Sequence, residues 1–129
     1  MVGYPPPKIH NQIMPITVYG IPNCGSVQKA RAWLATQGLD YEFHDFKKAG
    51  LSKEIIATWL KVVSWEILVN KKGTTWRGLP DATKASITNA ASASQLMLEN
   101  PSVIKRPVLC QGKTVLVGFD EAIYQEQLR

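Results

Sequence analysis

The sequence predicts an α/β fold in which a four-stranded mixed sheet packs against helices and an α-helical insertion interrupts the chain. Three observations lead to this prediction. A strand–helix–strand pattern occupies residues 16–46, helical patterns dominate residues 51–101, and two apolar runs around a tight turn precede a last helix. With 129 residues, of which 45% are hydrophobic, the chain is long enough for one domain with a substantial core.

The first part of the pattern is a βαβ unit. Residues 16–20 (ITVYG) are β-branched and aromatic, which is typical of a buried strand. From Gly25 the apolar residues recur at helical spacing on one face, namely Val27, Ala30 and Leu34, and Gly38 is suited to end this helix. Residues 41–44 then alternate between aromatic and polar side chains, as in a strand. Two strands joined by a helix in this way are expected to be parallel.

The middle of the chain, roughly residues 51–101, is predicted to be helical. Ser52 is a suitable N-cap for the apolar segment that follows it, and Pro101 cannot continue the helix before it. Residues 71–79 (KKGTTWRGL) are expected to form a loop between helices.

The end of the chain returns to strand periodicity. The runs RPVLC and KTVLVGF lie around the turn Gln111–Lys113 and predict a β-hairpin. Asp120 is expected to cap a last helix, whose predicted buried positions are Ala122, Ile123 and Leu128. The order βαβ, helical insertion, ββα is the plan of a thioredoxin-like fold with an α-helical insertion.

Composition narrows the function classes. No apolar stretch is long enough to span a membrane, and the Pro-rich start has no secretory-signal pattern. We therefore expect a cytoplasmic protein with a disordered N-terminal extension (1–13) before a single domain (14–129). Two cysteines and two histidines are too few for a disulfide framework or a metal cluster. The net charge of +5 is dispersed, which favours a solvated surface over nucleic-acid binding.

Cys24 is the candidate catalytic residue. It stands at the predicted N-terminus of the first helix, where the N–H groups and the helix dipole stabilise a thiolate. Gly25 allows a ligand to approach the backbone, and Ser26 offers a hydroxyl group. The alternative is a small buried residue at a helix start, but a strand–turn–Cys–helix segment in a βαβ unit favours redox chemistry. Because Val27 occupies the place of a second cysteine in a Cys-x-x-Cys pair, the resolving thiol is external or Cys110.

Arg106 and Pro107 form the second candidate site. A cis bond between them would aim Arg106 at Cys24, although the residues alone favour a trans proline at a strand start. Cys110 lies three residues further, roughly 10 Å along the strand, which is too far for a direct disulfide with Cys24, so core packing is the favoured role. Weaker candidates for anion contacts are Lys71, Lys72 and Arg77.

Four segments together resemble the arsenate reductase (ArsC)/Spx family, most closely its YffB-like branch: YGIPNCGSVQKARAWL, LDYEFHDFKKAGL, KKGTTWRGL and VIKRPVLC. The resemblance extends from Ile16 to Leu128. It implies a thioredoxin-like fold with a helical insertion, a catalytic Cys24, and an anion-binding Arg106 beside a cis Pro107.

The same resemblance implies a glutathione-dependent thiol reductase without a bound cofactor. Glutathione would be the co-substrate, and glutaredoxin is a further possible partner. Neither nucleic acid nor membrane is an expected partner. The residues expected to bind glutathione are Asn23, Gly25, Ser26, Arg77, Arg106 and Pro107.

Two departures from the family pattern define the alternatives. Arsenate reductases of the family carry a further arginine just after the last hairpin strand, where this chain has Gly118. Arsenate reduction coupled to glutathione and glutaredoxin is therefore the second hypothesis. Spx regulators carry a Cys-x-x-Cys switch, whereas Val27 stands at its second position here. A regulator that binds RNA polymerase is the third hypothesis.

Overall fold

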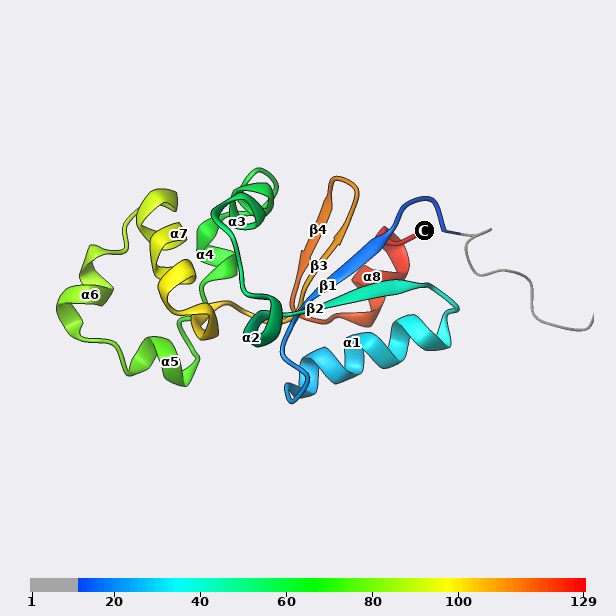
Figure 1. The fold of residues 1–129 in the computed structure, drawn as a ribbon, viewed down its shortest axis with the longest axis horizontal. Coiled ribbons are helices and arrows are strands. Elements are labelled where there is room, and N and C mark those ends of the chain that lie inside the picture. Colours follow the sequence, from blue (N-terminus) through cyan, green and yellow to red (C-terminus); the bar gives the residue numbers. More distant parts are fainter. Residues whose placement is uncertain (1–11) are drawn as a thin grey trace, which may run out of the picture. The chain divides into compact units, whose positions relative to one another are not determined.

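The computed structural model describes residues 12–129, so most of the predicted extension lies outside the described residues. The contacts of the chain divide it into two compact units (Figure 1). The first contains the described residues up to Asp45 together with Arg106–Arg129, and the second is Phe46–Lys105. The prediction of a single domain with an insertion at about residues 51–101 is not tested by this division. The helical segment does occupy a unit of its own.

The first unit contains one four-stranded mixed sheet, in the order β2-β1-β3-β4. β1 and β2 are parallel, whereas β1 with β3 and β3 with β4 are antiparallel. The strands are β1 (Ile16–Gly20), β2 (Tyr41–Asp45), β3 (Val108–Gln111) and β4 (Thr114–Val117), and the helices are α1 (Gly25–Thr36) and α8 (Glu121–Gln127). This arrangement confirms the predicted α/β, thioredoxin-like fold class.

One face of this sheet holds the core of the unit. Side chains that alternate along the strands, such as Ile16, Val18 and Leu109, pack against residues of α1 and α8 and are almost fully buried. On α1 the predicted apolar face is confirmed, because Val27, Ala30 and Leu34 have no exposed surface. This burial fixes the rotation of α1 and therefore the direction in which its first residues point.

The last helix is buried differently from the prediction. Ala122 and Ile123 are exposed, whereas Tyr124 and Leu128 are buried. Asp120 is the N-cap as expected, and its Oδ1 accepts a hydrogen bond from the backbone N–H of Ile123 at 3.1 Å. With the helix start fixed at this point, the positions four residues apart, 124 and 128, face the sheet.

The two ends of the described chain are held together at the end of β3. The buried side chain of Gln111 donates hydrogen bonds to the backbone carbonyls of Met14 and Arg129 at 2.9 and 2.8 Å, and accepts one from the Arg129 N–H at 3.1 Å. The N–H of Ile13 also bonds to the Arg129 carbonyl, at 3.1 Å. Ile13, the last residue of the predicted extension, is thus bonded to the C-terminal residue that Gln111 holds.

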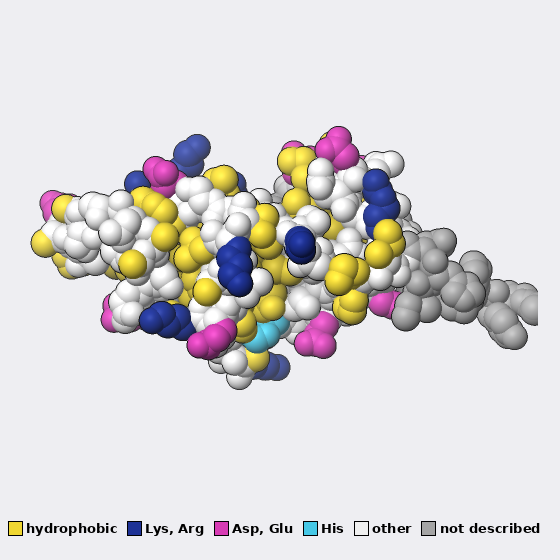
Figure 2. Space-filling model, turned by 90° about the horizontal axis from the view of Figure 1, so that it is seen from above, with side chains coloured by type: hydrophobic (Ala, Val, Ile, Leu, Met, Phe, Trp, Pro, Cys, Tyr) yellow, Lys and Arg dark blue, Asp and Glu magenta, His cyan; other side chains and the backbone are white. Residues whose placement is uncertain are grey.

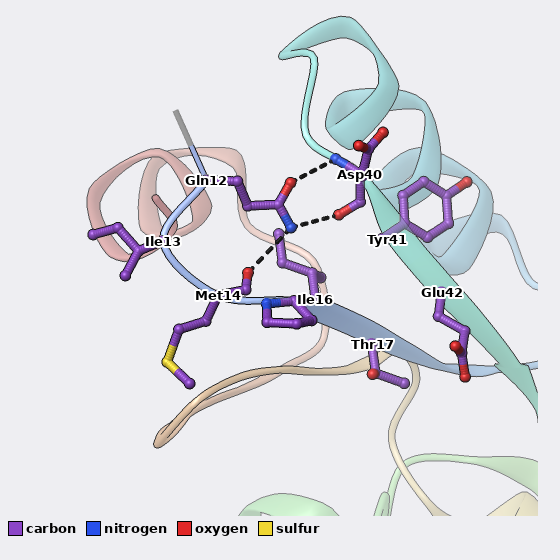
Figure 3. Close-up of a pocket in the computed structure, with 9 residues that line it drawn as sticks. Gln12, Ile13, Met14, Ile16, Thr17, Asp40, Tyr41 and Glu42 are labelled. Atoms are coloured by element: carbon purple, nitrogen blue, oxygen red, sulfur yellow. Dashed lines mark hydrogen bonds between the residues drawn. The ribbon is translucent and has the colours of Figure 1, made fainter. Parts of the chain in front are cut away.

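A cavity of about 310 Å³ lies at the N-terminal ends of β1 and β2 (Figure 3). It is lined by residues 12–17 and 40–42. Gln12 joins these two segments, because its amide both donates to the Asp40 carbonyl and accepts from the Asp40 N–H, each at 2.8 Å (Figure 3). Cys24 follows the opposite, C-terminal end of β1, and no predicted site residue lines this cavity.

The second unit is helical, as predicted. Its helices are α2 (Phe46–Ala49), α3 (Lys53–Leu60), α4 (Trp65–Leu68), α5 (Thr74–Arg77), α6 (Asp81–Ser86) and α7 (Ala90–Glu99), followed by a 3₁₀ turn (Pro101–Val103). Ser52 caps α3 as expected, by accepting from the Ile55 N–H at 3.1 Å. The buried side chains of this unit include Ile56, Trp59, Leu68, Met97 and Ile104.

The segment 71–79 is not entirely a loop, because residues 74–77 form the short helix α5. Gly73 stands at its N-cap position and Trp76 is its buried residue. The burial of Trp76 anchors the turn, a tertiary effect that the polar local sequence does not predict.

No helix among the described residues is long and apolar enough to cross a membrane. Figure 2 shows lysine and arginine side chains dispersed over the face in view, between hydrophobic and acidic ones.

Candidate active site

Cys24 lies where the chain passes from β1 into α1. Residues 21–24 form a turn, in which the Cys24 N–H bonds to the Ile21 carbonyl at 3.4 Å. Cys24 is the N-cap residue of α1, with an extended backbone (φ −84°, ψ 128°), and its side chain is partly exposed. The predicted position of the thiol at the helix N-terminus is therefore present in the structure.

The surroundings of Cys24 favour its thiolate form. Partial burial is the largest single influence and raises the pKa of Cys24, because it disfavours charge. Hydrogen bonds from the Val27 N–H, the Arg106 side chain and the Ser26 N–H oppose it, together with the charge of Arg106. Their combined effect is larger, so the pKa of Cys24 lies below its ordinary value.

The strand order explains why Arg106 is close to Cys24. β1 and β3 are antiparallel neighbours, with Tyr19 opposite Val108. The residues just before β3 therefore lie beside the residues just after β1. The Nε atom of Arg106 is buried. The Arg106–Pro107 peptide bond is cis, as the family resemblance implied and contrary to the trans bond that the residues alone favoured.

The remaining predicted site residues of this unit flank the thiol. Asn23, Gly25 and Ser26 are exposed, and Pro107 is buried. A Cβ atom built on Gly25 would meet nothing within 4 Å. Pro107 has no N–H to give to the sheet, but its carbonyl accepts a hydrogen bond from the Gly118 N–H at 2.7 Å, which joins the start of β3 to the end of β4.

Cys110 was predicted to be a core residue, and this prediction is wrong. Its side chain is only partly buried. It lies on β3 between Thr17 and Val115 of the neighbouring strands. In a strand successive side chains alternate, so Cys110 points away from the face on which Leu109 meets the helices. Neither Cys24 nor Cys110 forms a disulfide.

The opposite sheet face also carries a titratable cluster around Tyr19. The ring of Tyr19 lies 4.8 Å from that of His44, measured between centroids. Burial, with the nearby Cys110 and Glu42, raises the pKa of Tyr19. The hydroxyl of Tyr19 therefore stays protonated at neutral pH.

The weaker anion candidates belong to the second unit. Arg77 is exposed on α5, and Lys72 is exposed in the turn before it. The Nζ atom of Lys71 lies 5.4 Å from the ring centroids of both Trp65 and Trp76. This placement gives Lys71 a role in packing the unit through cation–π contacts.

Gln28 is a residue of the site that the sequence reasoning missed. Its Nε2 atom donates to the Pro22 carbonyl at 3.2 Å, and so connects the first turn of α1 to the residues before Cys24. The sequence indicates only that Gln28 lies off the buried face of the helix. Its bond to Pro22 uses a backbone carbonyl, which every residue has, so the partner has no recognisable residue type in the sequence.

Metal binding has no candidate cluster in the described part of the chain. Within residues 12–129 no three His, Cys, Asp or Glu side chains form a group that could hold a metal ion.

Known proteins resemble this chain along most of its length. The family model described as the ArsC family matches residues 19–127. An uncharacterized protein of Haemophilus influenzae is 41% identical over 110 residues, which are 85% of this chain and 96% of that protein. The global transcriptional regulator Spx of Streptococcus agalactiae is 30% identical over 111 residues, with 82% and 77% of the two chains covered.

Solved structures agree with this result. The structure of a YffB protein has 40% identity and a TM-score of 0.84, and the match covers 88% of this chain and 99% of that one. An arsenate reductase (ArsC) related protein from Brucella melitensis has 48% identity and a TM-score of 0.70, with 89% and 95% covered. Since the family model matches most of the sequence and these relatives align with it over nearly their whole lengths, the chain belongs to the ArsC family.

Proposed function

We propose that the protein is a thiol–disulfide oxidoreductase that uses Cys24 as its nucleophile and glutathione as its co-substrate. The observation that carries this proposal is a partly exposed thiol at the N-terminus of α1 whose pKa is lowered by two backbone N–H groups and by Arg106. Membership of the ArsC family supports it. A glutathione-dependent role also agrees with the expected cytoplasmic location.

The proposed reaction consists of two thiol–disulfide exchanges. In the first, the Cys24 thiolate attacks the glutathione sulfur of a mixed disulfide; the new bond joins Cys24 to glutathione, and the substrate thiolate leaves and takes up a proton. In the second, a further glutathione thiolate attacks this bond, releases oxidised glutathione and regenerates the Cys24 thiolate. The net reaction converts the mixed disulfide and one added glutathione thiol into the substrate thiol and oxidised glutathione, so the added glutathione is oxidised as the substrate sulfur is reduced. No second protein cysteine is needed, which fits Val27 at the place of a resolving thiol.

Binding of glutathione is assigned to groups around the thiol. The N–H groups at the start of α1 and the Arg106 guanidinium are suited to carboxylates, because both present hydrogen-bond donors with positive charge. Asn23, Ser26 and Gly25 are exposed around Cys24, and Gly25 leaves room above the backbone. The contribution of Arg77, on α5 of the second unit, stays a prediction.

Arsenate reduction is the second candidate, and it is supported by the similarity to the arsenate reductase related protein of Brucella melitensis. The position where the family's arsenate reductases carry a further arginine is Gly118, which has a φ of 80°. This left-handed conformation favours glycine over any residue with a side chain. Turnover of arsenate with glutathione and glutaredoxin would support this candidate, and no turnover at millimolar arsenate would exclude it.

A regulatory role is suggested by the Spx relatives. Position 27, where those regulators carry the second cysteine of their switch, holds a fully buried valine that packs the helix onto the sheet. Co-purification with RNA polymerase at low salt would support this role, and its failure would count against it.

The proposed function is tested by glutathione-dependent reduction of the mixed disulfide of glutathione and 2-mercaptoethanol. Cys110→Ser should keep the activity, whereas Cys24→Ser should lose it, by at least a hundredfold on the general scale of an enzyme without its nucleophile. Unchanged turnover by Cys24→Ser would overturn the proposal.

A further inference from the structure

The turn that carries Cys24 is held by few bonds. Its internal bond, from the Cys24 N–H to the Ile21 carbonyl, is long at 3.4 Å. The first helical bond of α1, from the Gln28 N–H to the Cys24 carbonyl, is 2.9 Å. The side chain of Gln28 adds a third bond, because its Nε2 donates to the Pro22 carbonyl at 3.2 Å.

The N-terminus of α1 also differs from those of α3, α7 and α8. Side chains of Ser52, Asn89 and Asp120 accept hydrogen bonds from N–H groups at the starts of α3, α7 and α8. At the start of α1 this position holds the thiol of Cys24, a weaker acceptor than a hydroxyl, amide or carboxylate oxygen, and the first turn contains no acidic residue. The residue that normally fixes the chain at a helix start is thus replaced by the proposed nucleophile.

Gln28 supplies an additional restraint on the turn from within the helix. Its main chain and its side chain bond to the carbonyls of Cys24 and Pro22, which lie on either side of Asn23. The turn therefore cannot rotate away from α1 without breaking both bonds. The side chain of Gln28 makes this contact with the backbone and leaves the thiol open for chemistry.

We propose that Gln28 is a positioning residue of this site: its carboxamide holds the Pro22 carbonyl and thereby keeps the Cys24 sulfur directed at the N–H groups of Ser26 and Val27. The inference rests on the proposed function, and it concerns a residue that acts through the turn without touching the reacting atoms. Loss of the carboxamide lets the turn move, which weakens the N–H contacts that stabilise the thiolate.

The test is the pH dependence of Cys24 alkylation by iodoacetamide in a Cys110→Ser background. Gln28→Met keeps the length and helix propensity of the side chain but removes its donor. We expect a raised pKa of Cys24 and alkylation at pH 6.5 slowed roughly threefold, in keeping with one solvent-exposed hydrogen bond. Gln28→Ala should give the same shift. Gln125→Met, at an exposed glutamine of α8, is the matched control and should leave the profile unchanged.

The outcomes separate this inference from the proposed function. If the pKa of Cys24 is low in the parent protein and both Gln28 variants leave it unchanged, the role of Gln28 is wrong and the proposed function stands. If the parent pKa is not low, the basis of the proposed function fails, and the inference fails with it. Thermal unfolding of each variant shows that a shifted profile belongs to a folded protein.

Discussion

Arg106 is the cationic side chain that stabilises the Cys24 thiolate, by a hydrogen bond and by its charge. Both contributions depend on a residue that stands far from Cys24 in the sequence and beside it in the sheet, because β3 pairs with β1. Two substitutions grade the loss, since methionine removes both the donors and the charge, whereas lysine keeps a positive charge without the planar fork of guanidinium donors.

Arg106→Met is therefore expected to raise the pKa of Cys24 and to slow its alkylation at pH 6.5 by roughly fivefold to tenfold, a range reduced for the partial exposure of the thiol. Arg106→Lys should fall between this variant and the parent. The measurement is the pH profile of alkylation, and Lys113→Met, which removes an exposed charge from the hairpin turn, is the control. Equal profiles for Arg106→Met and the control would show that Arg106 does not act on the thiol.

Two glycines near the site differ in what the fold requires of them. A Cβ atom on Gly20 would lie 2.7 Å from Cγ2 of Val27, a side chain with no exposed surface and so no room to move. A Cβ atom on Gly25 would meet nothing within 4 Å. The fold therefore needs glycine at position 20 and does not need it at position 25.

Gly20→Ala should accordingly reduce the free energy of unfolding by about 1–3 kcal/mol, the usual effect of overpacking a core. Gly25→Ala should not reduce it. Denaturant unfolding of both variants checks this pair, and a destabilised Gly25→Ala would mean that the start of α1 is packed more tightly than described.

At the scale of single residues the sequence predicted the features that chain order determines. Cys24 stands at a strand-to-helix junction, and the hairpin places Arg106 at the start of the strand beside it. Gln28 was missed because its bond to Pro22 depends on the conformation of the turn. Cys110 was predicted to be a core residue because an apolar run does not show which sheet face meets the helices of its unit.

Helix α8 illustrates how elements are held on the core side of the sheet. Tyr124 is almost fully buried, and its hydroxyl donates to the Gly118 carbonyl at 3.2 Å. Its ring also contacts those of Trp33 on α1 and Phe119, at centroid distances of 5.7 and 4.9 Å. Burial raises the pKa of Tyr124, so the hydroxyl keeps the proton that it donates.

Tyr124→Phe should lower the free energy of unfolding by about 1 kcal/mol, since it removes one buried hydrogen bond and preserves the ring. Tyr124→Ala should have a larger effect, about 3–5 kcal/mol, because it leaves a cavity between α1 and α8. Thermal or denaturant unfolding measures both. A Tyr124→Phe variant as unstable as Tyr124→Ala would show that the hydroxyl contributes more than the ring.

The elements themselves could be predicted well where local signals were strong. The apolar face of α1, the caps of α3 and α8 and the hairpin turn at Gly112 all follow from spacing and residue type. Two features could not be predicted from the sequence, namely the inward face of α8 and the existence of α5. Both depend on which bulky side chain is buried in the core. Tyr124 and Trp76 are those side chains.

At the scale of the whole molecule, the lowered pKa of Cys24 links the ionisation of the thiol to folding. In the unfolded chain the thiol has its ordinary, higher pKa, so between the two values the unfolded state binds the proton and the folded state does not. Stability from this group is therefore complete above the unfolded pKa and is lost as the pH falls through the folded pKa.

Two proteins are compared, the Cys110→Ser variant and the variant in which Cys24 is also replaced by serine. Between the folded and unfolded pKa values of Cys24, the free energy of unfolding should rise more steeply with pH in the first than in the second. Denaturant unfolding at several pH values below 9 measures the difference. Higher pH is avoided because the fold raises the pKa values of Tyr19 and Tyr124. These tyrosines ionise first in the unfolded chain, which lowers the free energy of unfolding as the pH rises and opposes the effect of Cys24. A difference that falls with rising pH would contradict the lowered pKa.

The central claim is that the fold makes Cys24 a thiolate that is ready to react near neutral pH. The most direct measurement is the rate of Cys24 alkylation as a function of pH, followed by intact mass in the Cys110→Ser protein. We predict an apparent pKa below the ordinary value of about 8.5 for a cysteine thiol. An apparent pKa at or above that value would contradict the claim and leave Cys24 as an unreactive residue at a helix start.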